Sequence, residues 1–129
     1  MANGIFSALG AAYRAIVARL ARDGVNVGTS AYPRVEVHTV VENPPLDKDG
    51  RVRSITCVVE SVSDERMSDV MDMNEDNLAL LLGEALGITE AWRIIGIQPG
   101  QLQQMTEPTE TSAVLYRMLQ NLTVYVEQI

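Results

Sequence analysis

Two side chains in this 129-residue sequence carry the groups on which most enzymatic chemistry depends: the single histidine, His38, and the single cysteine, Cys57. A nucleophilic triad or a thiol enzyme would have to use one of them. His38 falls on the polar face of an expected strand, whereas Cys57 lies between Ile55 and Val59 on an apolar face, where free cysteine is usually inert. The sequence contains no nucleophile elbow, P-loop, dinucleotide fingerprint or paired zinc ligands. We therefore expect no enzyme, and no catalytic, cofactor-binding or metal-binding residues.

Acidic residues are the remaining source of chemistry. Asp47, Asp49 and Gly50 match part of a calcium loop, but Pro45 stands where the first acidic ligand belongs. A second acidic cluster at residues 72–76 also departs from that pattern. Because a sequence does not show which carboxylates converge, a carboxylate-only active site stays open as an alternative to two solvated surfaces.

The net charge of −7 is distributed unevenly along the chain. Residues 1–34 carry a net charge of +3, and residues 35–129 carry −10. One hypothesis is that the basic N-terminal helix of one copy meets an acidic face of another copy. The alternative is solvated charge that maintains solubility. Few clustered Lys and Arg residues are present, which disfavours tight binding of duplex DNA.

Length and composition indicate one globular domain. The chain is 47% hydrophobic and 21% charged, and its single cysteine excludes an internal disulfide. The longest apolar run, residues 78–82, is far shorter than the roughly 20 residues of a membrane span. The N-terminus lacks the features of a secretory signal. We expect cytosolic synthesis and no membrane association.

The first 24 residues predict a helix over residues 3–22 that ends at Gly24, a residue suited to helix termination. Its apolar stripe at helical spacing comprises Phe6, Leu9, Tyr13, Ile16 and Leu20.

Two alternating segments predict strands over residues 34–42 and 52–62. The buried face of the first consists of Val35, Val37, Thr39 and Val41. Between the two segments, the dipeptides Pro44-Pro45 and Asp49-Gly50 are strong turn signals. We expect a hairpin with an extended tip.

A second amphipathic helix follows, capped by Ser68 or Asn74 and stopped by Gly87. Its apolar stripe comprises Met67, Val70, Met71, Leu78, Leu81, Leu82 and Ala85.

The C-terminal part predicts a third strand over residues 92–98, a turn at Pro99-Gly100, and a mobile polar loop over residues 101–112. The final strand, residues 113–129, has two partly apolar faces, which indicates cover on both sides or a subunit interface. The predicted fold class is α+β: a single domain, residues 1–129, with a four-stranded, mainly antiparallel sheet and two helices packed on one face.

This layout resembles the tail terminator, or tail completion, proteins of long-tailed bacteriophages. The resemblance covers nearly the whole chain and rests on the order of the predicted elements, the length of the chain and the character of its segments, with no diagnostic motif. The segments that carry it are the helix at residues 4–22, Tyr32-Pro33, ITCVVESVSD at residues 55–64, WRIIGIQ at residues 92–98 and VLYRMLQNLTVYVEQI at residues 114–129.

Members of that family form rings, usually hexameric, which cap the completed tail tube and join it to the head. The resemblance implies a structural virion protein at the tail-neck junction, assembled in the host cytoplasm and without a cofactor. The implied partners are other copies of the chain, the tail tube protein, and head-tail connector or neck proteins. DNA would pass through the ring lumen without specific binding, and an acidic lumen would keep it from adhering.

Three groups of residues are candidates for these contacts. The interface candidates at the hairpin tip are Asn43, Pro44, Pro45, Leu46, Asp47, Lys48, Asp49, Gly50 and Arg51. The candidates for an acidic lumen are Asp64, Glu65, Glu107 and Glu110. The candidates for subunit contacts are Arg14, Arg19, Arg22, Arg117 and Tyr125.

Two alternatives remain at this point. One is a head-tail connector or neck adaptor of the same virion. The other is a small stand-alone ligand-binding or enzymatic domain, which the mass in solution would distinguish from a ring.

Overall fold

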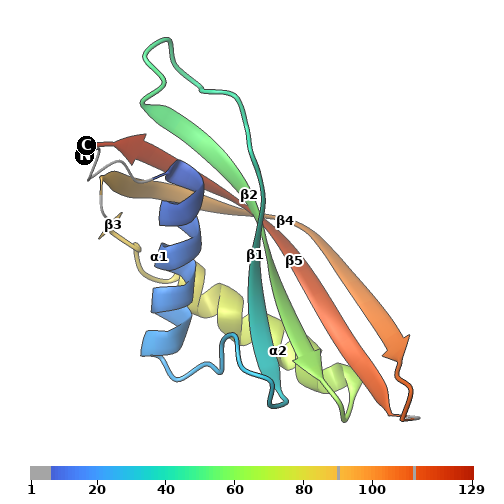
Figure 1. Ribbon diagram of the computed structural model, residues 1–129. Helices are drawn as coiled ribbons and strands as arrows, with labels where there is room; N and C mark the ends of the chain where they lie inside the picture. The colour runs from blue at the N-terminus through green and yellow to red at the C-terminus, as the bar shows by residue number, and fades with distance from the viewer. Residues whose placement is uncertain (1–6, 90, 112) are drawn as a thin grey trace.

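The computed structural model describes residues 7–89, 91–111 and 113–129 (Figure 1). In chain order, the elements are α1 (Ala8–Arg22), β1 (Arg34–Glu42), β2 (Val52–Ser63), α2 (Met67–Leu82), β3 (Ile88–Thr89), β4 (Trp92–Pro108) and β5 (Val114–Gln128).

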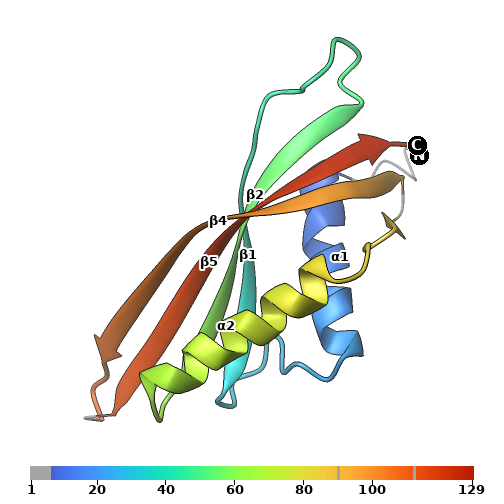
Figure 2. The same ribbon diagram turned by 180° about the vertical axis from the view of Figure 1, so that it is seen from behind.

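The strands form one antiparallel sheet with the order β1-β2-β5-β4-β3. Both helices pack along one side of this twisted sheet (Figures 1 and 2). The α+β class is therefore confirmed, but the sheet has five strands where four were predicted, because the two-residue β3 adds to the edge of β4. We call the side without helices the open face.

Helix α1 packs on the sheet mainly through small residues. Ser7 caps its N-terminus, where Ser7 Oγ accepts a hydrogen bond from Gly10 N at 2.9 Å. Its buried residues are Ala8, Ala11, Ala12, Ala15, Ile16, Arg19 and Leu20. Tyr13, predicted in the core, is 41% exposed, because the alanine side of the helix faces the sheet. The predicted start of the helix and Phe6 lie outside the described residues, while Gly24 has the positive φ of +85° expected of a terminating glycine.

Strands β1 and β2 form the predicted hairpin, with β1 at the predicted bounds and β2 one residue longer. Val35 and Val37 are buried as predicted, but Val41 is 46% exposed. A register shift between Thr39 and Val41 explains the difference, since a bulge changes the face on which later residues lie. The burial of Cys57 is confirmed, and desolvation raises the pKa of its thiol to about 12.

Helix α2 begins and ends at different residues from those predicted. It starts at Met67 after Arg66, whose side chain makes no capping hydrogen bond, and it ends at Leu82. The capping predictions for Ser68 and Asn74 and the stop at Gly87 were therefore wrong. Two amides, Asn74 and Asn77, are buried on its sheet side.

Val70 and Leu81 of the predicted apolar stripe are buried as predicted, and the two amides lie between them on the sheet side of α2. Asn77 Nδ2 donates to Ser61 Oγ at 3.1 Å, and Asn74 Nδ2 donates to Gln120 Oε1 at 3.4 Å. Met71 and Leu82, also predicted in the stripe, are 42% and 45% exposed. The middle of α2 thus meets the sheet partly through polar contacts, because Ser61 and Gln120 lie opposite the two amides.

Strand β4 corrects the prediction of a mobile loop at residues 101–112. The strand crosses two register shifts, between Ile94 and Gly96 and between Pro99 and Leu102, and pairs with β5 as far as Pro108. Pro99 and Gly100 fall at the second irregularity, where a missing backbone N–H is tolerated. The β4 and β5 strands therefore form a long hairpin that extends away from α1 and has the start of α2 beside its far half (Figure 2).

Strand β5 lies in the middle of the sheet and has two different faces. Its helix-side residues Met118, Gln120, Leu122, Val124 and Val126 are buried. The residues that alternate with them are mostly half-buried on the open face, although neither helix lies over that face. The predicted pair of partly apolar faces is confirmed, with one of them covered by the helices.

Candidate functional site

A charged network crosses the open face from β1 to β4, and Glu60 on β2 is its centre. Glu60 is 8% exposed. Its Oε2 accepts a hydrogen bond from Arg117 Nη1 at 2.8 Å, and its Oε1 lies 3.2 Å from His38 Nε2. Arg117 also pairs with Glu36 at 3.6 Å and with Glu107 at 3.3 Å. Four strands thus contribute to one set of ion pairs.

The strand register explains why these residues meet. Glu36 pairs directly with Glu60, while Arg34 and Arg117 both pair with Val62 in the neighbouring row. Because side chains alternate across a strand, all five lie on the same face. Val62 is fully buried on this helix-free side, flanked in register by the two long arginine side chains.

Arg117 holds the network together electrostatically. Burial on its own lowers the pKa of a guanidinium, but the hydrogen bonds and charges of Glu60 and Glu107 outweigh it, so the pKa of Arg117 lies above its ordinary value. Arg117 therefore stays cationic wherever the protein is folded.

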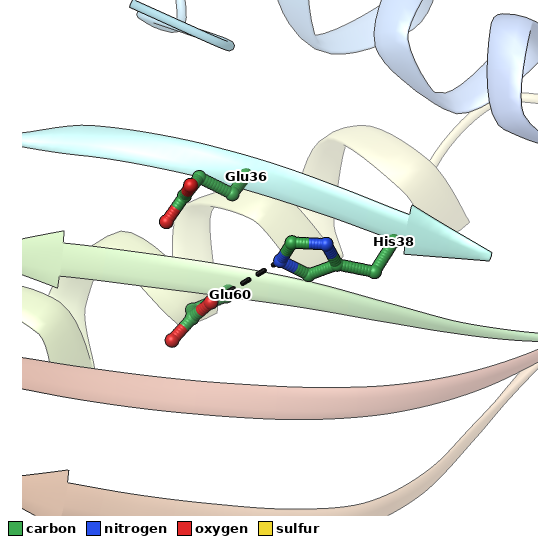
Figure 3. Close-up of side chains that lie close together, drawn as sticks. All are labelled: Glu36, His38 and Glu60. Atoms are coloured by element: carbon green, nitrogen blue, oxygen red, sulfur yellow. Dashed lines mark hydrogen bonds and ion pairs between the residues drawn. The ribbon is translucent and has the colours of Figure 1, made fainter. Parts of the chain in front are cut away.

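The triad Glu36, His38 and Glu60 has the composition of a metal site. One ligand atom from each lies within 4.8 Å of the others, and Figure 3 shows the three side chains gathered over β1 and β2. However, the Arg117 guanidinium already contacts both carboxylates, and Arg34 Nε lies 3.7 Å from Glu36. A divalent cation would have to compete with these arginines for the carboxylate oxygens. The arrangement therefore favours a set of ion pairs that links the strands over a metal site.

The predicted hairpin tip, residues 43–51, is the loop that joins β1 to β2 and projects at one end of the molecule (Figure 1). Backbone and side-chain hydrogen bonds order it. Asp47 Oδ1 accepts from Val52 N at 3.2 Å, and Leu46 N donates to Val52 O at 2.9 Å. Leu46 nevertheless leaves its side chain 59% exposed, and Lys48 is also exposed.

The acidic candidates gather at the opposite end of the sheet. Asp64 and Glu65 lie in the turn after β2, and Glu110 lies in the turn after β4; all three are exposed. Glu107, predicted in a mobile loop, is instead on β4 and paired with Arg117. The structure thus brings Asp64, Glu65 and Glu110 to one end because Ser63 pairs with Tyr116 near the β4–β5 turn.

Arg19, a candidate subunit contact, is instead an internal clamp between the helices. It is 7% exposed, and its guanidinium donates to the carbonyl oxygens of Leu80, Glu84 and Ala85 at 2.8–3.1 Å. These carbonyls lie at and beyond the C-terminus of α2, where backbone acceptors lack helical partners. We remove Arg19 from the candidate contacts, since its donors are used within the chain.

The other contact candidates are more accessible. Arg14 is exposed on α1, and Arg22 pairs with Asp23 and Glu84 at the surface. Tyr125 is half-buried on the open face, and its hydroxyl donates to Gln98 Oε1 at 3.3 Å. Arg117 belongs to the charged network, so Arg14, Arg22 and Tyr125 remain the candidates for subunit contacts.

A groove between α2 and the outer half of β4 was missed by the sequence analysis. Its volume is about 410 Å³. Its lining includes Met71, Asp72, Asn74, Glu75, Leu102 and Met118. The length of the predicted final strand was the one sequence feature that indicated this groove, because a long strand needs a neighbouring strand of similar length. The polar sequence and two prolines of β4 concealed that partner.

Neither helix of the described chain is long and apolar enough to cross a membrane.

No protein-family model matches the chain, and no curated protein sequence matches it. Among solved structures, the chain is similar to a chain from the virion of a native gene transfer agent (GTA) particle. The two share 18% sequence identity with a TM-score of 0.67, over 94% of this chain and 95% of that chain. At this identity, the likeness shows a shared fold over nearly the full length of both.

Proposed function

We propose that this chain is a structural virion protein that forms a ring on the end of a phage-like tail tube, stops its polymerisation and joins the tail to the head. The observation that supports a virion role is the shared fold, over nearly the full length, with a chain of the GTA virion. The order of elements and the closing strand pair support the tail terminator family in particular.

The geometry of the protomer suits a ring of identical copies. A ring needs two different complementary surfaces on each copy, since a self-complementary contact closes at two copies. The tip at residues 43–51 projects at one end of the molecule (Figure 1), whereas the α2–β4 groove is lined by α2, by Leu102 on β4 and by Met118 on β5, in the half of the sheet farther from the tip. Each copy therefore offers one projecting and one receiving surface.

An acidic lining would allow DNA to pass through such a ring. Residues 35–129 carry a net charge of −10, and Asp64, Glu65 and Glu110 are exposed at one end of the sheet. Phosphates are repelled by a surface of the same sign, so DNA would not adhere to it. We place these three residues nearest the lumen and leave out Glu107, whose charge is paired with Arg117.

We also propose that the protein acts by binding and not by catalysis. Within the described residues, the cluster of Glu36, His38 and Glu60 is engaged by Arg117, and Cys57 is a buried thiol whose raised pKa keeps it protonated. Its partners would be the tail tube protein and the head-tail connector or neck proteins.

Electron microscopy tests the proposal in two steps. The purified protein, alone and mixed with its tail tubes, should form rings that sit on tube ends. Loss of the protein should give tubes of irregular and excess length without heads. Rings bound only to the head portal would favour a neck adaptor, and a monomer that binds neither structure would contradict a virion role.

A further inference from the structure

We propose that the tip of one copy inserts into the α2–β4 groove of the next copy, with Leu46 on the apolar floor of the groove and Lys48 against its acidic rim. This inference rests on the proposed ring and names the contact that builds it.

The groove and the tip match in polarity. The floor contains Met71, Leu102 and Met118, of which Met71 and Leu102 are 42% and 47% exposed. Leu46 is 59% exposed at the end of a loop held by its own hydrogen bonds. Exposed apolar side chains on both partners gain stability when a contact removes them from water.

The charges match as well. Lys48 is the single lysine of the chain, and it is exposed. Asp72 and Glu75 line the groove and are also exposed. No ion pair within the described residues involves any of these three side chains. A contact between the lysine of one copy and the carboxylates of the next would pair charges that the single chain leaves unpaired.

One buried acceptor in the groove also lacks a partner. Asn74 is 2% exposed, and its Oδ1 has no hydrogen-bond partner among the described residues, although its Nδ2 donates to Gln120. Buried polar atoms are normally paired, so this acceptor is a weak point in the wall of the groove. Its oxygen is closed to solvent in the single chain, so an inserted loop would reach it only after the Asn74 side chain turns toward the groove.

The positions of the two surfaces make the contact head-to-tail. The tip leads into the end of β2 that pairs with Glu127 of β5, whereas Met118 of the groove lies in the other half of β5, so one copy does not fill its own groove. Such a heterologous contact leaves each copy with a free tip and a free groove until a ring closes.

Disulfide trapping tests the contact directly. The variant Leu46→Cys/Leu102→Cys, in a Cys57→Ala background, should give a ladder of covalent oligomers on oxidation, because thiols must lie close to bond. An equal mixture of the two single-cysteine variants should give linked pairs and no higher ladder. The matched control Leu46→Cys/Ala18→Cys moves the second thiol to the exposed side of α1 and should give no ladder.

Charge exchange provides a second measurement without new thiols. Lys48→Glu should raise the concentration needed for half-assembly by about tenfold or more, measured by light scattering, because it places like charges at the rim. Glu75→Lys should restore assembly of Lys48→Glu. Asp76→Lys, an equal charge change one residue along α2 and outside the groove lining, should not restore it.

The outcomes separate this contact from the proposed function. Rings without a ladder, or linked pairs from Leu46→Cys alone, would overturn the tip-groove contact and leave the terminator role standing. A ladder in a protein that leaves tube length unchanged would establish the contact and contradict the terminator role. A protein that stays monomeric at high concentration and on tubes, without cross-links, contradicts both.

Discussion

Arg117 Nη1 lies 2.8 Å from Glu60 Oε2, and this contact joins the central strand β5 to β2 on the open face of the sheet. Both side chains are largely withdrawn from water, with exposed fractions of 16% for Arg117 and 10% for Glu60. An ion pair in this position behaves differently from one at the surface, because each partner relies on the other to offset its lost hydration.

Removal of Arg117 should therefore be costly. Arg117→Met leaves Glu60 with His38 as its remaining partner, and we expect the free energy of unfolding to fall by roughly 1–3 kcal/mol, measured by urea denaturation. The double variant Arg117→Met/Glu60→Gln should recover part of that loss, since the unpaired charge is gone. Arg93→Met is the control, because its 3.7 Å pair with Glu127 is half-exposed and should change stability by less than about 1 kcal/mol. Equal losses in the two single variants would contradict a central role for Arg117.

Arg19 should contribute to stability in a different way. Arg19→Met keeps a similar apolar stem but removes the donors to three carbonyl groups near the end of α2. We expect a loss of roughly 2–4 kcal/mol in the free energy of unfolding, because those buried acceptors lose charged partners. Arg22→Met, one turn further along α1 and exposed, should have a clearly smaller effect. Stability of Arg19→Met close to that of the parent protein would show that the clamp is dispensable.

Cys57 should be inert in the folded protein. Burial raises the pKa of its thiol to about 12, so a thiol reagent at pH 8 should label it only after denaturation. The same shift makes stability depend on pH. Between pH 9 and 12 the folded state keeps a proton that the unfolded state loses, so stability falls as the pH rises, by up to roughly 1.4 kcal/mol per unit.

The variant Cys57→Ala isolates this contribution, because tyrosines also titrate in that range. Its free energy of unfolding should fall less steeply with pH above 9 than that of the parent. Parallel curves for the two proteins, or rapid labelling of the folded parent, would show that the thiol is accessible.

Hydrogen exchange should distinguish a strand from a loop at residues 102–108. Amides of this segment that bond to β5 should exchange far more slowly than those of Lys48 and Asp49 at the exposed tip. Exchange can be followed by mass spectrometry of peptic peptides. Equally fast exchange in the two segments would restore the loop that the sequence predicted.

Much of the fold follows from local pattern. Period-two alternation located β1 and β2, turn residues located the tip between them, and Gly24 marked the end of α1. These features are set by neighbouring residues, so a sequence displays them directly. The same reasoning placed His38 on the polar face and Cys57 in the core.

The sequence predictions that were wrong share one cause, which is contact between residues that are far apart in the chain. Gln101 to Pro108 is polar because both of its faces are largely exposed, yet β5 supplies its backbone partners. Asn74 and Asn77 are buried because Ser61 and Gln120 face them. Arg19 is internal because the last carbonyls of α2 end beside it. In each case a residue distant in sequence decides the environment, and the local pattern of residues 101–108 gave no sign of the groove that depends on β4.

Strands β2 and β5 form an uninterrupted pair that connects the two ends of the molecule. Their pairing runs from Val52 opposite Glu127 to Ser63 opposite Tyr116 without a register shift. The twist of this strand pair contributes to the angle between the tip and the groove. In the head-to-tail ring proposed above, that angle would determine how many copies close the circle. If the proposed contact builds the ring, a bulge engineered into β2 should therefore change the number of subunits while it leaves both contact surfaces intact.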